Sequence, residues 1–414
     1  MLLRFAFLVA LFTIPSACIA ADWAQFLGPQ RNGISKEENL IDRFSVDGPN
    51  IRWRTDLGVG MSGIVVTDKT ACTLYQDDQQ QYVVAVDVLT GDVKWKTAIA
   101  PNYKNGMGDG PRSTPAIDQG QLFALSGEGV LACLSFPKGE KVWSVDPFKE
   151  FGGKPSEYGM SCSPILTDEH VIVTVGASKA TVAAFDRKTG ELAWTAGNGN
   201  PAGYSSPALL KVKQTVQLVV FHGSGAMGLV PKTGKEIWSY PYITDYNCNI
   251  ATPISVGDNV LLSAGENHGT VLLSVPEKAG GKISEIWKSF GNRSDFRNEW
   301  QTSILLNEFL FGFDNVGSAG PVTNLTCLNA KDGTVMWQKR RFGKGNMIAA
   351  DGKFWCTTMD GDLVIVNATI KNYEELDRAT VMGQTRQAPT LSDGKLYLRD
   401  GAEMICIDIR KNSN

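Results

Sequence analysis

Residues 85–95 read AVDVLTGDVKW, and near-copies of this stretch recur along the chain. Residues 184–194 (AFDRKTGELAW) keep the same Ala, Asp, Gly and Trp. A small residue, the Gly and the Trp are kept in residues 133–143 (CLSFPKGEKVW), 228–238 (GLVPKTGKEIW) and 327–337 (CLNAKDGTVMW). Residues 273–287 (LSVPEKAGGKISEIW) are interpreted as the same unit with four residues inserted in its turn.

The repeated unit predicts a β-hairpin. A hydrophobic strand ends at the small residue, the Asp side chain caps a tight turn, and the Gly adopts the positive φ that the turn requires. A second strand then carries the Trp, whose indole would bury about 150–250 Å2 against a neighbouring sheet. The small residue leaves room for that ring.

Seven tryptophans recur at intervals of 42 to 51 residues. They are Trp53, Trp95, Trp143, Trp194, Trp238, Trp287 and Trp337. This period is typical of propeller blades rather than of helical repeats. A chain of 414 residues would otherwise suggest two or three domains, but a propeller closes as one unit. The tryptophans are therefore predicted to dock each radial sheet on the next.

An apolar strand that begins near Ser-Pro, Thr-Pro or an equivalent pair predicts the innermost strand of each blade. The predicted starts are Ser62, Thr114, Ser163, Ser206, Thr252, Thr302, Ile348 and Ala388. Eight starts predict an all-β, eight-bladed β-propeller of four-stranded antiparallel blades over residues 51–414. The last blade lacks a tryptophan strand, so residues 51–55 are expected to close it as its outermost strand. In the seventh blade, Thr380-Val-Met is expected where the Trp would be.

The N-terminus has the features of a secretory signal peptide at residues 1–20. Arg4 precedes a short apolar run, and Cys18-Ile-Ala fits a small-x-small cleavage site. We therefore expect an exported protein, periplasmic, in the cell envelope or secreted, with an extended arm at residues 21–50. A lipoprotein signal acylated at Cys18 is the alternative, and membrane association is expected only in that case.

Composition excludes several classes of function. The net charge of −3 gives no broad electrostatic reason to bind nucleic acid. The eight cysteines form no C-x-x-C and no paired Cys-His spacing, so no metal site is predicted. A monomer is expected.

The hairpin motif resembles that of the PQQ-like β-propeller repeat family. Residues 85–95 and 184–194 match its tryptophan-docking motif, Ala-x-Asp-x-x-x-Gly-x-x-x-Trp, at every defined position. The family includes quinoprotein dehydrogenases, which bind pyrroloquinoline quinone and Ca2+, and outer-membrane assembly lipoproteins of the BamB type, which are scaffolds without a cofactor. Residues 23–33 (WAQFLGPQRNG) also resemble the N-terminal signature of secreted members.

Polar and aromatic residues gather on the propeller face where loops enter the innermost strands. The candidate binding residues there are Arg112, Tyr158, Tyr204, Asn249, Glu299, Trp300, Arg386, His222 and His268. The two histidines occupy similar hairpin positions in successive blades, where we expect them to face solvent; a metal or acid-base pair is the alternative. We expect this face to bind a protein or an extended peptide, with addition of a strand at a blade edge as another mode.

A quinone enzyme is the principal alternative. Arg112 or Arg386 would bind the cofactor carboxylates, Trp300 would stack on the ring, and Glu299 with Asn298 would ligate Ca2+. Asp109 or Asp314 would then be the general base. The chain lacks the adjacent Cys-Cys pair and the long insertions of that class. We therefore predict no catalytic residue, no cofactor and a non-catalytic envelope scaffold; an outer-membrane assembly factor of the BamB type is a further alternative.

Overall fold

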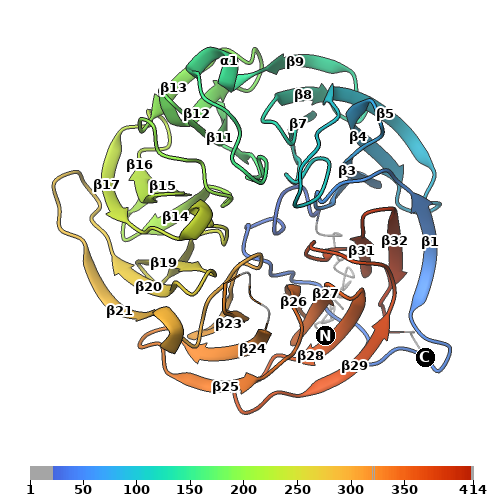
Figure 1. Ribbon diagram of the computed structural model, residues 1–414. Helices are drawn as coiled ribbons and strands as arrows, with labels where there is room; N and C mark the ends of the chain where they lie inside the picture. The colour runs from blue at the N-terminus through green and yellow to red at the C-terminus, as the bar shows by residue number, and fades with distance from the viewer. Residues whose placement is uncertain (1–21, 319, 321, 412–414) are drawn as a thin grey trace, which may run out of the picture.

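The computed structural model describes residues 22–318, 320 and 322–411. The predicted signal peptide, with Cys18, lies outside these residues. Eight four-stranded antiparallel sheets are arranged as blades around a central axis (Figure 1). The eight-bladed propeller predicted from the sequence is confirmed.

Each blade runs from its innermost to its outermost strand. Blade 1 contains β2 (Val65–Thr67), β3 (Thr70–Gln76), β4 (Gln80–Asp87) and β5 (Val93–Pro101), and blade 2 contains β6 (Ala116–Asp118), β7 (Gln121–Leu125), β8 (Leu131–Ser135) and β9 (Lys141–Val145). Blade 3 contains β10 (Ile165–Leu166), β11 (His170–Ala177), β12 (Ala180–Asp186) and β13 (Leu192–Ala196), and blade 4 contains β14 (Ala208–Val212), β15 (Thr215–His222), β16 (Gly225–Leu229) and β17 (Glu236–Pro241).

The last four blades follow the same order. Blade 5 contains β18 (Ile254–Val256), β19 (Asn259–Ala264), β20 (Gly269–Ser274) and β21 (Ser284–Phe290), and blade 6 contains β22 (Ile304–Leu306), β23 (Phe309–Val316), β24 (Val322–Asn329) and β25 (Val335–Lys339). Blade 7 contains β26 (Gly345–Ala350), β27 (Lys353–Thr358), β28 (Asp362–Asn367) and β29 (Glu375–Thr380), and blade 8 contains β30 (Thr390–Ser392), β31 (Lys395–Arg399), β32 (Glu403–Asp408) and β1 (Asn50–Asp56).

Helices are short and lie between blades. They are α1 (Pro147–Phe151), η1 (Asp245–Asn247) and η2 (Gly291–Arg293). None of the helices in the described part of the chain has the length and apolar character needed to cross a bilayer.

The two ends of the chain share the eighth blade, as predicted. Strand β1 pairs antiparallel with β32, and Trp53 lies opposite Cys406. An ion pair between Arg54 and Glu403 joins the same two strands. The first strand therefore closes the ring.

The tryptophans bind each blade to the next. The Trp143 indole N–H donates a 3.0 Å hydrogen bond to the carbonyl of Arg187 in the turn of the following blade. Gly190 of that turn has a φ of +76°, and a Cβ on it would lie 2.7 Å from the Trp143 ring. The indoles of Trp53, Trp95, Trp287 and Trp337 make the equivalent bond, to Val88, Pro137, Ala330 and Thr369.

Blade 5 differs from the sequence-based expectation. Leu272, rather than Leu273, lies opposite Trp287, so the turn contains five inserted residues and not four. Trp238 of the preceding blade donates instead to the side chain of Gln217 in its own blade, at 2.7 Å. The Trp194 indole N–H is buried and has no hydrogen-bond partner.

The seventh blade also corrects an expectation. Asp377, not Thr380-Val-Met, lies at the tryptophan position, opposite Ile365. The physical reason is the split eighth blade: since β1 comes from the N-terminal part of the chain, no turn joins β32 to β1, and a tryptophan would have nothing to dock on. Asp377 instead accepts a 2.7 Å hydrogen bond from the backbone N–H of Phe44.

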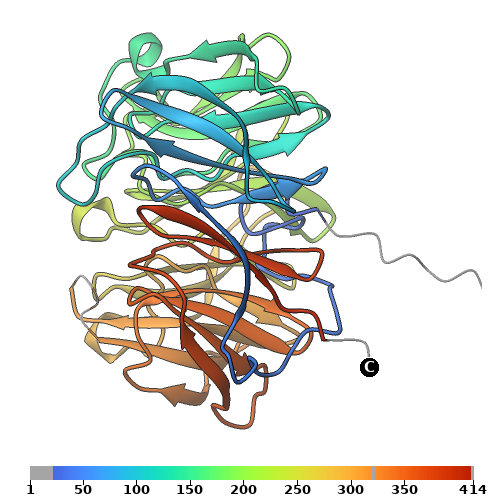
Figure 2. The ribbon, with the colours of Figure 1, turned by 90° about the vertical axis from the view of Figure 1, so that its right-hand side faces the viewer.

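The N-terminal arm, residues 22–49, crosses one end of the ring and is bound by blades on both sides (Figure 2). Trp23 is 2 % exposed and exchanges two backbone hydrogen bonds with Val66 of blade 1. The Arg31 guanidinium donates to the carbonyls of Pro164 and Pro207, which lead into blades 3 and 4. Further along, Ser35 donates to Ala349 of blade 7. The arm therefore covers the channel at this end.

Candidate binding cavity

A cavity of about 650 Å3 lies where the loops enter the innermost strands. Interblade loops supply most of its wall, and Phe26 of the arm also lines it. A second cavity, of about 410 Å3, is lined by arm residues that include Arg31 and by innermost-strand residues that include Leu210. The arm thus contributes to both cavities, and the loop-side cavity is the one that contains the predicted polar ring.

Six of the nine candidate residues line the loop-side cavity. They are Arg112, Tyr158, Tyr204, Glu299, Trp300 and Arg386. The structure therefore brings them together from five interblade loops, since Glu299 and Trp300 share one loop, although their role in binding stays a prediction.

His222, His268 and Asn249 do not line this cavity. His222 is 5 % exposed, its Nδ1 accepts a hydrogen bond from the Ser224 backbone, and burial lowers its pKa to about 4. The His268 ring lies 4.1 Å from that of Tyr242, and burial lowers its pKa. Asn249 is fully buried and donates to the carbonyl of His222. These side chains stabilise the junction of blades 4 and 5; among the described residues, no three His, Cys, Asp or Glu side chains form a metal-binding group.

One wall of the cavity is basic. The Arg386 guanidinium lies 4.5 Å from the centre of the Trp300 ring and donates to the carbonyl of Met107 at 3.1 Å. Arg112 donates to the carbonyls of Gly108 and Gly110 in the same loop. Burial lowers the pKa of Arg112, and the positive charge of Arg386 contributes. Within the described residues neither arginine has an ion-pair partner, so both can receive an anionic group.

Glu299 lies beside this wall and is 4 % exposed. Its Oε1 is 2.7 Å from the Lys344 ammonium, which also lies 3.9 Å from the centre of the Trp300 ring. Its buried Oε2 has no hydrogen-bond partner. Burial is the main cause that raises the pKa of Glu299, and the neighbouring charge of Glu266 adds to it.

Three tyrosines form an aromatic wall. The rings of Tyr158 and Tyr204 are stacked at 5.7 Å, and the Tyr246 ring lies 6.4 Å from that of Tyr158. Tyr246 is 58 % exposed and has a φ of +56°, a left-handed conformation that is uncommon for a residue with a large side chain. The backbone of η1 therefore holds an exposed aromatic ring at the edge of the cavity.

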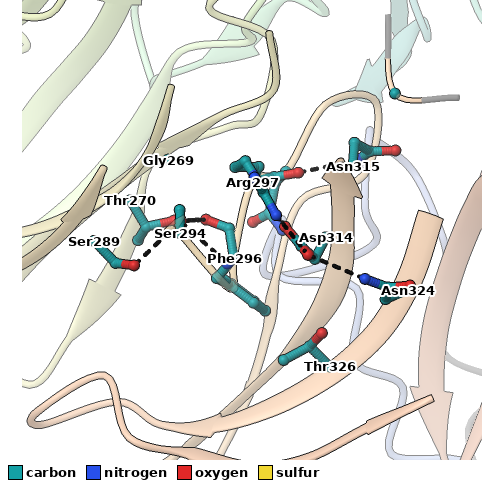
Figure 3. Close-up of polar contacts among 12 residues, drawn as sticks. Gly269, Thr270, Ser289, Ser294, Phe296, Arg297, Asp314, Asn315, Asn324 and Thr326 are labelled. Carbon is teal, nitrogen blue, oxygen red and sulfur yellow. Dashed lines mark hydrogen bonds and ion pairs between the residues drawn. The ribbon is translucent and has the colours of Figure 1, made fainter. Parts of the chain in front are cut away.

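A buried polar network holds the loop that carries Glu299 and Trp300 (Figure 3). Arg297 donates to both carboxylate oxygens of Asp314, at 2.7 and 2.9 Å. Asn324 donates to the same carboxylate at 3.3 Å, and Asn315 donates to the Arg297 carbonyl at 3.0 Å. The loop is thus bound to blade 6 by charged and neutral hydrogen bonds.

Several residues of the cavity were not among the nine candidates. They include Phe26, Met61, Met107, Tyr246, Glu266, Lys344 and Met359. Tyr246 and Lys344 lie in loops that precede an innermost strand, the signal used for the other candidates. Phe26 belongs to the arm, and no local pattern in the sequence shows that the arm reaches the axis.

The residues expected to hold a quinone and Ca2+ do not fit that role. The Glu299 Oε1 faces the cation of Lys344, and the Asn298 side-chain oxygen accepts from the Ser303 hydroxyl. Of the two candidate bases, Asp314 is paired with Arg297 and Asp109 with Lys104. Two of the oxygens that would ligate Ca2+, Glu299 Oε1 and Asn298 Oδ1, are therefore already bound to groups of the protein, and a lysine cation lies beside the carboxylate.

Comparisons with known proteins agree with the fold. Residues 79–295, just over half of the chain, match the family model described as outer membrane protein assembly factor BamB. No curated protein sequence matches the chain.

Similar solved structures include quinohemoprotein alcohol dehydrogenases from Comamonas testosteroni (13 % identity, TM-score 0.68, covering 95 % of this chain and 81 % of that one) and Pseudomonas putida HK5 (12 %, 0.65, 95 % and 81 %). BamB from Moraxella catarrhalis is similar at 13 % identity and TM-score 0.59, over 86 % of this chain and 100 % of that one. At these identities the likeness shows the fold alone. From the motif, the eight blades and the family match, we conclude that the chain belongs to the PQQ-like β-propeller family, the one represented by the BamB model.

Proposed function

We propose that the protein is an exported, non-catalytic scaffold that binds a partner protein of the cell envelope through the loop-side cavity. The observation that supports this most is the basic wall of a cavity of about 650 Å3: Arg386 lies over the Trp300 ring, Arg112 lines the same cavity, and neither arginine has an ion-pair partner among the described residues. Tryptophan, tyrosine and arginine are the residues that contribute most binding energy at protein interfaces.

The shape of the site indicates an inserted segment rather than a flat contact. A volume of about 650 Å3 accepts a few side chains, as a pocket for a small ligand does. The arm crosses the opposite end of the ring, so the segment enters from the loop side. An extended peptide or a protruding loop of the partner meets both conditions.

The family match favours a BamB-like role over an enzymatic one. The finer hypothesis, an outer-membrane assembly factor, requires attachment to a membrane. Mass spectrometry of the mature N-terminus would support it by finding an acyl group on Cys18, whereas cleavage after Ala20 or Ala21 would favour a freely diffusing protein.

Peptide selection tests the proposed site. Purified protein is used to select heptapeptides from a displayed random library, and their affinities are measured by calorimetry. The triple variant Arg112→Ala, Trp300→Ala, Arg386→Ala is expected to lose binding by about 100-fold or more, because it removes interface-type side chains worth roughly 1–2 kcal/mol each. The control Arg52→Ala removes an exposed arginine of β1 and should leave the affinity unchanged. Equal affinity for all three proteins would refute this site.

A further inference from the structure

We propose that Arg112 and Arg386 together bind the carboxylate of an aspartate or glutamate side chain, so that the loop-side cavity selects an acidic segment of the partner. This inference rests on the proposed function and adds the chemical class of the residue that is recognised.

One loop fixes the two guanidinium groups. Arg112 donates to two backbone carbonyls of residues 107–110, and Arg386 donates to a third at 3.1 Å. The Arg386 guanidinium also lies 4.5 Å from the centre of the Trp300 ring. Burial lowers the pKa of Arg112, and the nearby charge of Arg386 adds to the effect. The two cations are therefore held close enough to repel each other.

Both arginines keep N–H donors for a ligand. A guanidinium has five N–H groups. Arg112 uses two of them on carbonyls, and Arg386 uses two on the Met107 carbonyl and the Met61 sulfur. The Nε of both arginines and the Nη2 of Arg386 have no acceptor among the described residues, and none of these nitrogens is buried. Since both side chains line the cavity, these donors can reach a carboxylate that enters it.

The charges that line the cavity leave a positive excess. The charged side chains of the lining are Arg112, Glu266, Glu299, Lys344 and Arg386. Three positive and two negative groups give a formal charge of +1. One carboxylate from a ligand would neutralise it.

The acids nearest to the two arginines are already paired. Asp109 acts on Arg112 and Glu299 acts on Arg386. Each of these carboxylates forms an ion pair with a lysine, at 3.0 and 2.7 Å, and neither forms one with an arginine of the described chain. A ligand carboxylate would therefore be the first direct counter-ion of both guanidinium groups.

Apolar groups surround this part of the wall. Met61, Met107 and Trp300 line the cavity beside the arginines. They can cover the methylene groups of a glutamate or aspartate side chain and exclude water from its carboxylate. A hydrogen bond between two charged groups is stronger in such a site than in water.

The probes are the selected heptapeptides, made with amidated C-termini so that only a side chain supplies a carboxylate. Aspartate or glutamate is expected to be enriched at one position, and its replacement by asparagine or glutamine should weaken binding about 10-fold or more. Raising NaCl from about 0.05 M to about 0.5 M should weaken the acidic peptide more than its amide analogue.

Variants of the two arginines assign the effect. In Arg112→Gln and in Arg386→Gln, the difference between the acidic and the amide peptide should shrink to about threefold or less, while the amide peptide keeps its affinity. A loss of the amide peptide as well would mean that the arginines act only by shaping the loop, and would contradict the inference. The matched controls Arg52→Gln in β1 and Arg293→Gln in η2 change exposed arginines that do not line the cavity, and both should keep the full difference.

The remaining outcomes separate this inference from the proposed function. If the peptides depend on Arg112, Trp300 and Arg386 but tolerate the amide, the inference is wrong and the proposed function stands. If only peptides with a free C-terminus gain affinity, the site recognises a chain end and the inference is also wrong. If binding is indifferent to those three residues, both fail.

Discussion

Arg297 and Asp314 form a two-pronged ion pair, at 2.7 and 2.9 Å, with side chains that are 4 % and 1 % exposed. The pair joins the loop of Glu299 and Trp300 to strand β23. Because both charges are buried, each depends on the other for its stability.

Removing one partner of this ion pair should therefore lower the free energy of unfolding. Asp314→Ala leaves the guanidinium buried without a counter-charge, and we expect a loss of about 3–5 kcal/mol in the free energy of unfolding, measured in urea. The double variant Arg297→Met, Asp314→Leu should recover much of this loss. As a control, Glu169→Ala breaks an exposed pair with Lys232 and should cost less than about 1 kcal/mol. If Asp314→Ala also lowered the free energy of unfolding by less than about 1 kcal/mol, the Arg297–Asp314 pair would not be what holds the loop.

The docking of tryptophan on glycine gives a second prediction. Gly190→Ala places a Cβ 2.7 Å from the Trp143 ring at a φ of +76°, whereas Gly257→Ala has a φ of +59° and no atom within 4 Å. Both variants lose roughly 1–2 kcal/mol from the left-handed backbone, and only Gly190→Ala also displaces the indole. Its unfolding midpoint should fall further, together with a change in tryptophan fluorescence. Equal losses would mean that docking contributes nothing measurable.

His222 gives a prediction on pH. Its folded pKa of about 4 lies below the unfolded value near 6.5, so the folded state binds fewer protons between these values. The stability linked to His222 is complete above pH 6.5 and is lost as the pH falls toward 4, by about 3 kcal/mol in all. His222→Asn, which keeps an acceptor for the Ser224 N–H, should flatten the dependence of unfolding free energy on pH in this window. Identical slopes for both proteins would contradict the buried, neutral imidazole.

The cofactor question has a direct test. Since the Lys344 ammonium already lies 2.7 Å from one oxygen of the carboxylate that would ligate calcium, and would repel a second cation there, we expect added pyrroloquinoline quinone and Ca2+ to produce neither saturable binding nor dye reduction. Absorbance titration and a dye assay with short alcohols measure both. Stoichiometric binding with turnover would overturn the non-catalytic proposal and favour the quinoprotein alternative.

The sequence predicted the fold because one motif contains all the geometry of a blade junction. Its Asp caps the turn, as Asp186 does for the backbone of Lys188, and its Gly makes room for the preceding indole. The motif says nothing of Asp377, whose role depends on the missing turn of the split blade. The contact between Asp377 and the N-terminal arm joins distant parts of the chain, so no short stretch of the sequence predicts it.

The candidate site was less predictable. Loops that enter innermost strands point toward the axis, so Arg112 and Trp300 were found by position alone. Hairpin residues such as His222 and His268 can equally pack against a neighbouring blade, as the contact of His268 with Tyr242 shows. The position of a residue in the sequence does not show whether its side chain points toward the axis or packs against the neighbouring blade.

A crystal structure with the tightest selected heptapeptide tests the central claim most directly. We predict that the peptide lies in the loop-side cavity, against Trp300 on one side and Tyr158 on the other. A peptide bound along an outer strand such as β13, with the cavity left to solvent, would contradict the account.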